Sequence, residues 1–238
     1  LSIPKEEILQ AHSEAKKELI DYVNTRTGIS MDYDTFTIGF ARRATPYKRA
    51  DFVFSDISRL FDINDKTGRM QIIYAGKAHP KDGGGKELIK KIFSRIKELS
   101  PKIRIAYLEN YDMTQGKLVT AGVDLWLNNP LPPQEASGTS GMKACLNGVP
   151  NLSVLDGWWI EGCIEDVTGW AIGSTQKHNT DSAQDTHDLY HKLEKMIIPM
   201  FYKEKDKWLE IMRHAIALNA SFFNTQRMVQ EYVLNAYL

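Results

Sequence analysis

Cysteine is scarce in this sequence, which has only two, Cys145 and Cys163, among 238 residues. Two cysteines cannot build the disulfide framework of a small secreted domain, so a hydrophobic core must hold the fold. No apolar run approaches the ~20 residues that a membrane-spanning helix needs. The first residues also lack the basic and apolar regions of a signal peptide. These absences favour a cytoplasmic protein that does not associate with a membrane.

Net charge is absent as well, because 30 lysines and arginines balance 30 aspartates and glutamates. A neutral chain lacks the broad positive field that attracts nucleic acid, so nucleic acid is not an expected partner. Hydrophobic residues make up 42% and charged residues 25% of the chain, which are ordinary globular values. The length suits one large α/β domain or two small ones, and assembly into a homo-oligomer stays open.

Apolar runs alternate with amphipathic stretches along most of the chain, as strands and helices do in an α/β protein. The predicted strands are Thr35–Ala41, Met70–Gly76, Ile103–Leu108, Leu125–Leu127 and Asn151–Leu155. The predicted helices are residues 4–24, Arg49–Phe61, Lys86–Leu99, Met142–Leu146, 187–196, 204–218 and 225–236, with a polar loop at 174–186. This order indicates a doubly wound parallel sheet. We expect a helical lead-in at 1–34, a Rossmann-like core for cofactor and phosphate at 35–173, and C-terminal helices at 174–238.

Polar or glycine-containing motifs follow four of the predicted strands. These motifs are Arg42 to Lys48, Gly76-Lys77, Glu109 to Tyr111, and Glu135 to Lys143. In doubly wound sheets, ligands bind beyond the carboxyl ends of the strands. The four motifs therefore predict one ligand site at that edge of the sheet.

The stretch Glu135-Ala-Ser-Gly-Thr-Ser-Gly-Met-Lys143 places small residues just ahead of a helical run. Bare backbone amides at a helix N-terminus attract an anion. A lysine one turn inside that helix can bond to a carbonyl carbon, and pyridoxal phosphate carries both a phosphate and an aldehyde. The spacing indicates an anion site beside Lys143, although a glycine-rich loop before an ordinary helix with a solvated lysine fits the same pattern.

Four cationic side chains, Arg42, Arg43, Lys48 and Arg49, follow the first predicted strand. Arginine can grip a phosphate with two parallel hydrogen bonds, and lysine adds a compact charge. A basic run is often only a solvated surface. Because this run leaves the end of an apolar strand, where side chains can turn into a crevice, we predict phosphate binding.

Four segments of the chain resemble the glycogen/α-glucan phosphorylases. The stretch from Glu135 to Lys143 resembles the cofactor-lysine motif of that family, and Gly39–Arg49 resembles its phosphate-binding segment. Leu108-Glu-Asn-Tyr111 is similar to the strand end that leads to the cofactor. Val154-Leu-Asp-Gly-Trp158 follows the lysine helix as it does in the short bacterial and archaeal phosphorylases. The segments occur in the family's order, and the resemblance runs from about residue 8 to the end of the chain.

The resemblance implies the C-terminal half of a two-domain GT-B architecture, with an N-terminal partner domain outside this sequence. The implied reaction is reversible phosphorolysis of an α-1,4-glucan or maltodextrin by orthophosphate, which releases α-glucose 1-phosphate. The implied cofactor is pyridoxal 5'-phosphate, bound covalently to Lys143. The residues implied for the cofactor environment are Thr139, Ser140, Arg42 and Tyr111. The residues implied for phosphate and sugar are Arg43 and Lys48 on the phosphate, and Glu135, Ser137 and Gly138 on the sugar.

Two positions depart from the better-known animal and plant enzymes. Asp112 stands where those enzymes carry arginine, and Ser140-Gly141 stands where they carry Gly-Asn. Both differences fit the short branch, but an unpaired Asp112 would repel a nearby anion. Two other functions stay open. A nucleotide-sugar glycosyltransferase domain would share the architecture without needing a lysine at 143, and a non-catalytic fragment would bind phosphate or sugar without turnover.

Other candidate residues carry weaker signals. His187 and His191 lie one helical turn apart but have no third ligand nearby, so no metal site is expected. Trp158 and Trp159 suit either core packing or a sugar platform, and core packing is the simpler interpretation. Cys145, two residues after Lys143, is expected to be a small buried side chain.

Overall fold

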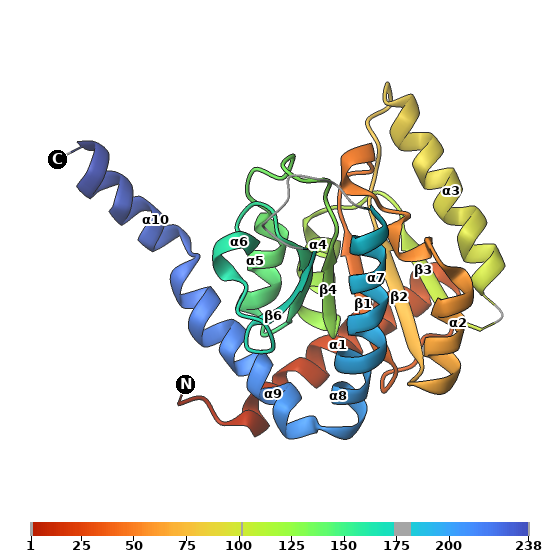
Figure 1. The fold of residues 1–238 in the computed structure, drawn as a ribbon, viewed down its shortest axis with the longest axis horizontal. Helices are drawn as coiled ribbons and strands as arrows, with labels where there is room; N and C mark the ends of the chain where they lie inside the picture. The colour runs from red at the N-terminus through yellow and green to blue at the C-terminus, as the bar shows by residue number, and fades with distance from the viewer. Residues whose placement is uncertain (1, 101, 174–181, 238) are drawn as a thin grey trace.

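The computed structural model describes residues 2–100, 102–173 and 182–237. Six strands form one sheet in the order β3-β2-β1-β4-β5-β6, and every neighbouring pair is parallel. The strands are β1 Phe36–Ala41, β2 Met70–Ala75, β3 Arg104–Leu108, β4 Leu125–Asn128, β5 Asn151–Val154 and β6 Gly169–Ile172. Helices pack against the sheet (Figure 1). The predicted doubly wound α/β fold is confirmed.

Helices connect the strands and continue after the last one. The α-helices are α1 Lys5–Thr27, α2 Ile57–Lys66, α3 Gly83–Leu99, α4 Met113–Gly122, α5 Thr139–Leu146, α6 Trp159–Gly162, α7 Ser182–Lys192, α8 Ile198–Lys203, α9 Lys205–His214 and α10 Thr225–Tyr232. Short 3-10 turns are η1 Pro46–Lys48 and η2 Phe52–Phe54, and π-helical turns are η3 Leu193–Ile197, η4 Ala215–Ala220 and η5 Val233–Tyr237. Among the described ranges, no helix is both long and apolar enough to cross a membrane.

The strand order reverses between β1 and β4, which are neighbours in the sheet but not in the sequence. The chain builds outward from β1 to β3 and then returns to add β4, β5 and β6 on the other side. In doubly wound sheets a crevice opens at this reversal, beyond the carboxyl ends of the two central strands. The loops that follow β1 and β4 therefore border the expected ligand crevice.

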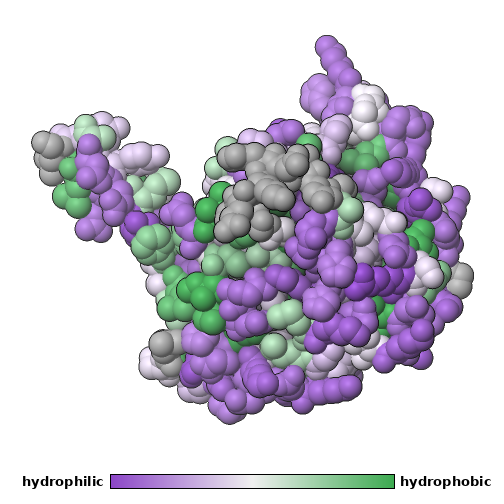
Figure 2. Space-filling view, in the orientation of Figure 1, coloured by the Kyte–Doolittle hydropathy of each residue, from purple (hydrophilic) through white to green (hydrophobic). Residues whose placement is uncertain are grey.

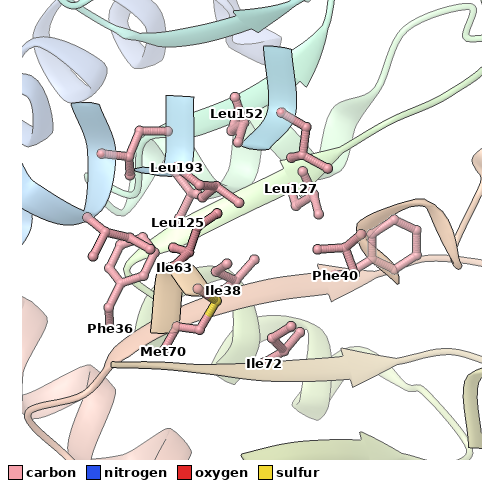
Figure 3. Packing of buried hydrophobic residues seen from close by; sticks show 14 of the residues in the cluster. Phe36, Ile38, Phe40, Ile63, Met70, Ile72, Leu125, Leu127, Leu152 and Leu193 are labelled. Atoms are coloured by element: carbon pink, nitrogen blue, oxygen red, sulfur yellow. The ribbon is translucent and has the colours of Figure 1, made fainter. Parts of the chain in front are cut away.

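The sheet is buried on both faces, as a parallel sheet covered by helices requires. On one face, Phe36, Ile38 and Phe40 of β1 pack with residues of β2, β4 and β5 and with Leu193 of η3 (Figure 3). On the other face, Leu19 of α1 packs in a second cluster that includes residues of β2, β3, β4 and α4. Each fully buried leucine or phenylalanine contributes about 1.5–3 kcal/mol of transfer free energy. The two cores hold the strands in place and so fix where their carboxyl ends lie.

The prediction of one helix over Arg49–Phe61 is wrong. Arg49 adopts a left-handed conformation with φ of 47°, and a 3-10 turn follows at Phe52–Phe54. Helix α2 begins only at Ile57, because the side chain of Asp56 accepts a hydrogen bond from the backbone N–H of Arg59 and caps the helix. The cap at Asp56 therefore places the start of α2 eight residues after the predicted start at Arg49.

Helices α4, α6 and α8 and strand β6 were not predicted from the sequence. Helix α4 contains Gly116 and Gly122, which lower helix propensity. Strand β6 has only four residues and is defined by its pairing with β5. Helix α8 follows a region predicted to be helical only as far as residue 196.

One further prediction at the C-terminus is wrong. Residues 182–186, predicted as loop, belong to α7, whereas 174–181 lie outside the described residues. The predicted helix 204–218 begins at Lys205 and passes into the π turn at Ala215.

The C-terminal helical segment, α10 with η5, extends away from the sheet (Figure 1). None of its described residues is buried. The face shown in Figure 2 is mainly hydrophilic, with apolar residues gathered near the point where this segment leaves the body. The exposed large hydrophobic residues of the segment are Met228, Val229, Tyr232, Val233, Leu234 and Tyr237.

Candidate functional site

Three predicted site residues meet where the sheet reverses. Oxygen Oε2 of Glu135 accepts hydrogen bonds from Nη2 of Arg42 and from Nζ of Lys48. Arg42 directly follows β1, Lys48 ends η1, and Glu135 lies in the loop between β4 and α5. All three side chains are largely buried, with exposed fractions of 6%, 9% and 12%. The structure therefore brings two cations and one carboxylate together at the predicted edge.

The charged groups of this cluster shift the pKa values of Glu135 and Arg42. Burial alone raises the pKa of Glu135, but the hydrogen bond from Lys48 and the charge of Arg42 outweigh it, so that pKa lies below its usual value. Burial is also the main reason that the pKa of Arg42 is lowered, and Glu135 opposes this effect. Two cations share one carboxylate, so the cluster carries one unbalanced positive charge. Such a cluster attracts an anion.

Arg42 has spare hydrogen-bonding capacity. Its Nη1 atom is buried and has no hydrogen-bond partner among the residues that the structure describes. The backbone at this point is fixed, because the N–H of Arg42 bonds to the carbonyl of Ala75 at 3.0 Å. A Cβ atom on Gly76 would lie 2.6 Å from the carbonyl oxygen of Arg42, so this close approach requires glycine. A phosphate or carboxylate oxygen is the natural partner for the free guanidinium N–H.

The turn after β5 holds the loop that carries Glu135. Oxygen Oδ2 of Asp156 accepts a hydrogen bond from the backbone N–H of Glu135 at 2.9 Å, and the N–H of Trp158 bonds to the carbonyl of Ser137 at 2.8 Å. Between them, Gly157 has φ of 56°, and a Cβ there would lie 2.5 Å from the carbonyl oxygen of Ser137. Asp156, Gly157 and Trp158 thus fix the Glu135 loop against the sheet.

Helix α5 begins directly after this loop. Its N-cap, Gly138, takes a left-handed conformation with φ of 92°, which glycine adopts without strain. The amides of Thr139 and Ser140 occupy the first turn, where a helix leaves N–H groups without intrahelical partners. The side chain of Lys143 is exposed, and within the described parts of the chain its Nζ forms no hydrogen bond or ion pair. The geometry offers an anion site next to an accessible amine.

This donor set fits pyridoxal phosphate. The first-turn amides of α5 and the unpartnered N–H of Arg42 are donors of the kind that a phosphate group accepts from, and the accessible amine of Lys143 could bond to an aldehyde. Gly141 adds room for close packing, since a Cβ there would lie 2.6 Å from Oδ1 of Asn151 and 3.0 Å from Nε1 of Trp158. Helix α5 can therefore lie directly on β5, with Lys143 on its outer side.

Three other predicted site residues, Arg43, Ser137 and Tyr111, make no side-chain hydrogen bond or ion pair with the Arg42–Lys48–Glu135 cluster within the described part of the chain. Arg43 is exposed and contacts neither Glu135 nor another carboxylate among the described residues. Ser137 is half-buried in the loop that Trp158 holds. The ring of Tyr111 packs on the second core cluster, and a Cβ on Gly116 would lie 3.1 Å from its hydroxyl. Burial, with a smaller effect of Asp112, raises the pKa of Tyr111.

Asp112 has a structural partner. Its side chain accepts a hydrogen bond from the backbone N–H of Gln115 at 2.8 Å and caps α4. The positive end of the helix dipole compensates its charge. The expected repulsion of an anion by an unpaired Asp112 therefore does not apply in this arrangement.

Two residues join the loops: Asn129, which sequence reasoning missed, and Arg49, for which it predicted only phosphate binding as part of the basic run. Asn129 is 1% exposed and donates to the carbonyls of Lys48 and Arg49 at 3.1 and 2.6 Å. Arg49, counted only as a fourth cation, donates to the carbonyls of Asn129 and Pro130 at 2.8 and 3.1 Å. The one available signal was Asn128-Asn129-Pro130 directly after a strand, a combination typical of turns that bond to neighbouring backbone.

The weaker candidates have structural roles. Trp158 and Trp159 are 4% and 0% exposed, and their ring centroids lie 5.0 Å apart, so core packing is confirmed. Cys145 is fully buried as expected, and burial raises the pKa of its thiol to about 12. The rings of His187 and His191 stack on α7. Within the described ranges, no group of three or more His, Cys, Asp or Glu side chains could hold a metal ion.

Comparisons with known proteins agree with the resemblance. A family model described as carbohydrate phosphorylase matches residues 4–170. Maltodextrin phosphorylase from Thermococcus litoralis is 44% identical over 253 residues, covering 99% of this chain and 30% of the relative. Glycogen phosphorylase from Aquifex aeolicus is 41% identical over 258 residues, covering 99% and 37%. Glycogen phosphorylase from Mycobacterium tuberculosis (strain H37Rv) is 39% identical over 217 residues, covering 87% and 25%. The chain thus spans between a quarter and somewhat more than a third of the length of these relatives.

Proposed function

This chain belongs to the carbohydrate phosphorylase family, and from that membership we propose that it is the cofactor-carrying part of an α-1,4-glucan phosphorylase. The proposed reaction is reversible phosphorolysis of a glucan or maltodextrin, in which orthophosphate takes the terminal glucose and releases α-glucose 1-phosphate. One observation carries the proposal. The cations Arg42 and Lys48 converge with Glu135 at the reversal of strand order, next to the helix that presents Lys143.

The cationic side chains and backbone amides of the site have the proposed role of binding phosphate groups. Arg43, whose side chain is exposed, and Lys48 are the proposed partners of the substrate phosphate, and the unpartnered N–H of Arg42 is the proposed donor to the cofactor phosphate. The first-turn amides of Thr139 and Ser140 add donors from the helix N-terminus. Pyridoxal phosphate, when bound, supplies a second phosphate group that can exchange a proton with the substrate phosphate. Lys143 acts as the anchor for that cofactor.

Glu135 is the proposed acceptor for sugar hydroxyls, together with Ser137 and Gly138. Its pKa lies below the usual value, so it is ionised at neutral pH and can only accept hydrogen bonds. A bound phosphate competes for the same cations that Glu135 holds here. Anion binding is therefore expected to release Glu135 from Arg42 or Lys48 and leave the carboxylate free to orient the sugar.

Residues 35–173 carry the proposed site, and a second domain would complete the cleft. This chain matches only 25–37% of the length of each relative, so more than half of each relative has no counterpart here. The C-terminal segment adds support, because no described residue of α10 and η5 is buried and six large hydrophobic side chains there are exposed. An exposed apolar helix is typical of a surface that another domain covers. The proposed partner is the remaining part of the phosphorylase.

The deciding experiment is reduction with borohydride after incubation with pyridoxal phosphate, followed by peptide mass mapping. Selective labelling of Lys143 is expected, and it should disappear in Lys143→Ala. Lys117→Ala is the matched control, since Lys117 is another exposed helical lysine, on α4. Equal labelling of all exposed lysines would count against a preformed cofactor site and favour the nucleotide-sugar alternative.

A second test addresses the missing part of the cleft. Alone, the chain should release no detectable glucose 1-phosphate from maltodextrin and orthophosphate. Fusion to the N-terminal portion of a relative such as the Thermococcus litoralis protein should give measurable release, which Lys143→Ala abolishes. Robust release by the isolated chain would show that a second domain is unnecessary.

A further inference from the structure

The loops that carry Lys48 and Glu135 are tied together by a compact set of hydrogen bonds. Arg49 donates from Nε to the carbonyl of Asn129 at 2.8 Å and from Nη2 to the carbonyl of Pro130 at 3.1 Å. In the reverse direction, Nδ2 of Asn129 donates to the carbonyls of Lys48 and Arg49 at 3.1 and 2.6 Å. The N–H of Leu131 bonds to the carbonyl of Tyr47 at 2.7 Å. We call this set of bonds the Arg49–Asn129 clasp.

Both side chains of the clasp are largely buried. Asn129 is 1% exposed, and the side chain of Arg49 is 13% exposed. The guanidinium of Arg49 lies over the ring of Phe52 at 4.3 Å and pairs with Asp185 of α7 at 2.8 Å. Its backbone takes the left-handed conformation at φ of 47°, which turns the chain sharply after Lys48. Buried, charge-assisted hydrogen bonds with several partners fix a backbone far better than a single exposed contact.

Asn129 and Arg49 bond to the backbone next to Lys48 and at the start of the loop that carries Glu135. Asn129 bonds directly to the backbone carbonyl of Lys48, so it sets where the lysine side chain starts. On the other side, Arg49 holds the carbonyls of Asn129 and Pro130, at the start of the loop that reaches Glu135. The turn after β5 holds only the far part of that loop, at Glu135 and Ser137. The clasp therefore links the backbones of the two loops, in addition to the side-chain bonds from Arg42 and Lys48 to Glu135.

We propose that Arg49 and Asn129 are positioning residues that hold Lys48 in register with Glu135, and so fix the distance between the phosphate and sugar subsites. The part that concerns phosphate and sugar rests on the proposed function. The part that concerns Lys48 and Glu135 does not. Neither Arg49 nor Asn129 contacts the Glu135 carboxylate, so both act through the backbone of the two loops.

Arg49→Lys and Asn129→Ala test the proposal in the 238-residue chain. Arg49→Lys keeps the charge but loses the forked donors that reach two carbonyls. Asn129→Ala changes no charge. Arg59→Lys is the matched control, because Arg59 also donates through Nε and Nη2 to a partner, Glu194, and lies 5.6 Å from an aromatic ring. Urea unfolding establishes that each variant is folded.

The first readout is the pKa of the Glu135 carboxylate, measured by carbon-detected NMR and assigned with Glu135→Gln. If the clasp positions Lys48, both variants raise this pKa toward its usual value, because Lys48 no longer stabilises the carboxylate, and the control leaves it unchanged. An unchanged Glu135 pKa in the folded variants overturns the proposal. This readout involves no phosphate, so it decides the positioning role even if the proposed function fails.

The second readout is the affinity for inorganic phosphate, measured by calorimetry. Both variants should bind orthophosphate about tenfold more weakly than the parent chain, which corresponds to ~1.4 kcal/mol. Arg59→Lys should bind it as the parent does. An equal loss in the control shows a general effect of arginine replacement and overturns the proposal. A parent chain that binds no orthophosphate, with Glu135 responding as expected, refutes the phosphate assignment alone.

Discussion

Lys48 and Glu135 form a largely buried ion pair although 87 positions separate them in the sequence. Lys48 follows the first strand of the sheet, and Glu135 follows the fourth. The two strands are neighbours because the chain reverses its direction of growth after β3. The contact is thus a consequence of topology, and it creates a cationic cluster with one internal counter-ion.

Glu135→Gln removes that counter-ion while keeping the shape of the side chain. Arg42 and Lys48 then lose the one carboxylate that they contact among the residues the structure describes. Because both cations are largely buried, the free energy of unfolding should fall by about 2 kcal/mol. Orthophosphate should restore most of this loss, because it replaces the missing charge. Urea unfolding with and without orthophosphate measures both effects.

Glu194→Gln is the control for this substitution. Glu194 also pairs with two cations, Arg59 and Lys195, but these contacts are more exposed. The loss of stability should be much smaller, and phosphate should not restore it. A phosphate effect of the same size in both variants would argue against a specific anion site.

At the opposite edge of the sheet, Asp124 is 2% exposed and lies between two basic residues. Its Oδ1 lies 3.0 Å from Nε2 of His12, and its Oδ2 accepts hydrogen bonds from Nζ of Lys16 at 2.6 Å and from the N–H of Thr37 at 2.7 Å. Burial raises the pKa of Asp124, but Lys16 and His12 outweigh burial, so that pKa lies below its usual value.

Asp124→Asn should therefore destabilise the chain in a pH-dependent way. A depressed pKa stabilises the fold at every pH above the unfolded value of about 3.9, and this stability is lost as the pH falls through the folded value. We expect a loss of about 3 kcal/mol at pH 7, and a smaller difference from the parent below pH ~4. Urea unfolding at several pH values tests this. Asp65→Asn is the control, because Asp65 pairs with Lys102 on the surface, and its free energy of unfolding should change little. A difference independent of pH would contradict the role of the charge.

Gly141→Ala should separate α5 from β5. The added Cβ would lie 2.6 Å from Oδ1 of Asn151 and 3.0 Å from Nε1 of Trp158, both in the buried interior. Overpacking of this kind costs about 1–3 kcal/mol. Gly83→Ala is the matched control, since a Cβ there meets nothing within 4 Å and Gly83 opens α3. Thermal unfolding should show a lower midpoint for Gly141→Ala alone.

The two thiols should react in a fixed order. Cys145 is 0% exposed, whereas Cys163 is partly exposed, and burial raises the pKa of both thiols to about 12. Since the thiolate is the reactive form, both should react slowly with a disulfide reagent in the folded chain, and Cys163 should react first. Cys163→Ser should remove the faster phase and leave only a reaction that requires unfolding. Rapid labelling of Cys145 in the folded variant would show that the packing beneath α5 is loose.

Much of the sheet could be predicted because its strands are continuous apolar runs. The strands around Ile38, Ile72 and Ile105 were expected at nearly their observed positions. Helix α4 and strand β6 were missed because their signals are weak along the chain. Gly116 and Gly122 disfavour a helix, and β6 is stabilised by pairing with β5 rather than by its own sequence.

The sequence by itself determined the class of fold and the loops that carry the candidate site, because strand and helix periodicity and turn residues are local properties. It also placed Lys143 in a helix that follows a glycine-containing loop. Only the tertiary structure decided that Arg42 rather than Arg43 shares Glu135 with Lys48, and that Arg49 and Asn129 join the two loops. Contacts between residues so far apart in sequence depend on which strands become neighbours and which way each side chain leaves its loop. Those choices are fixed by packing and hydrogen bonding across the whole sheet, and no local pattern encodes them.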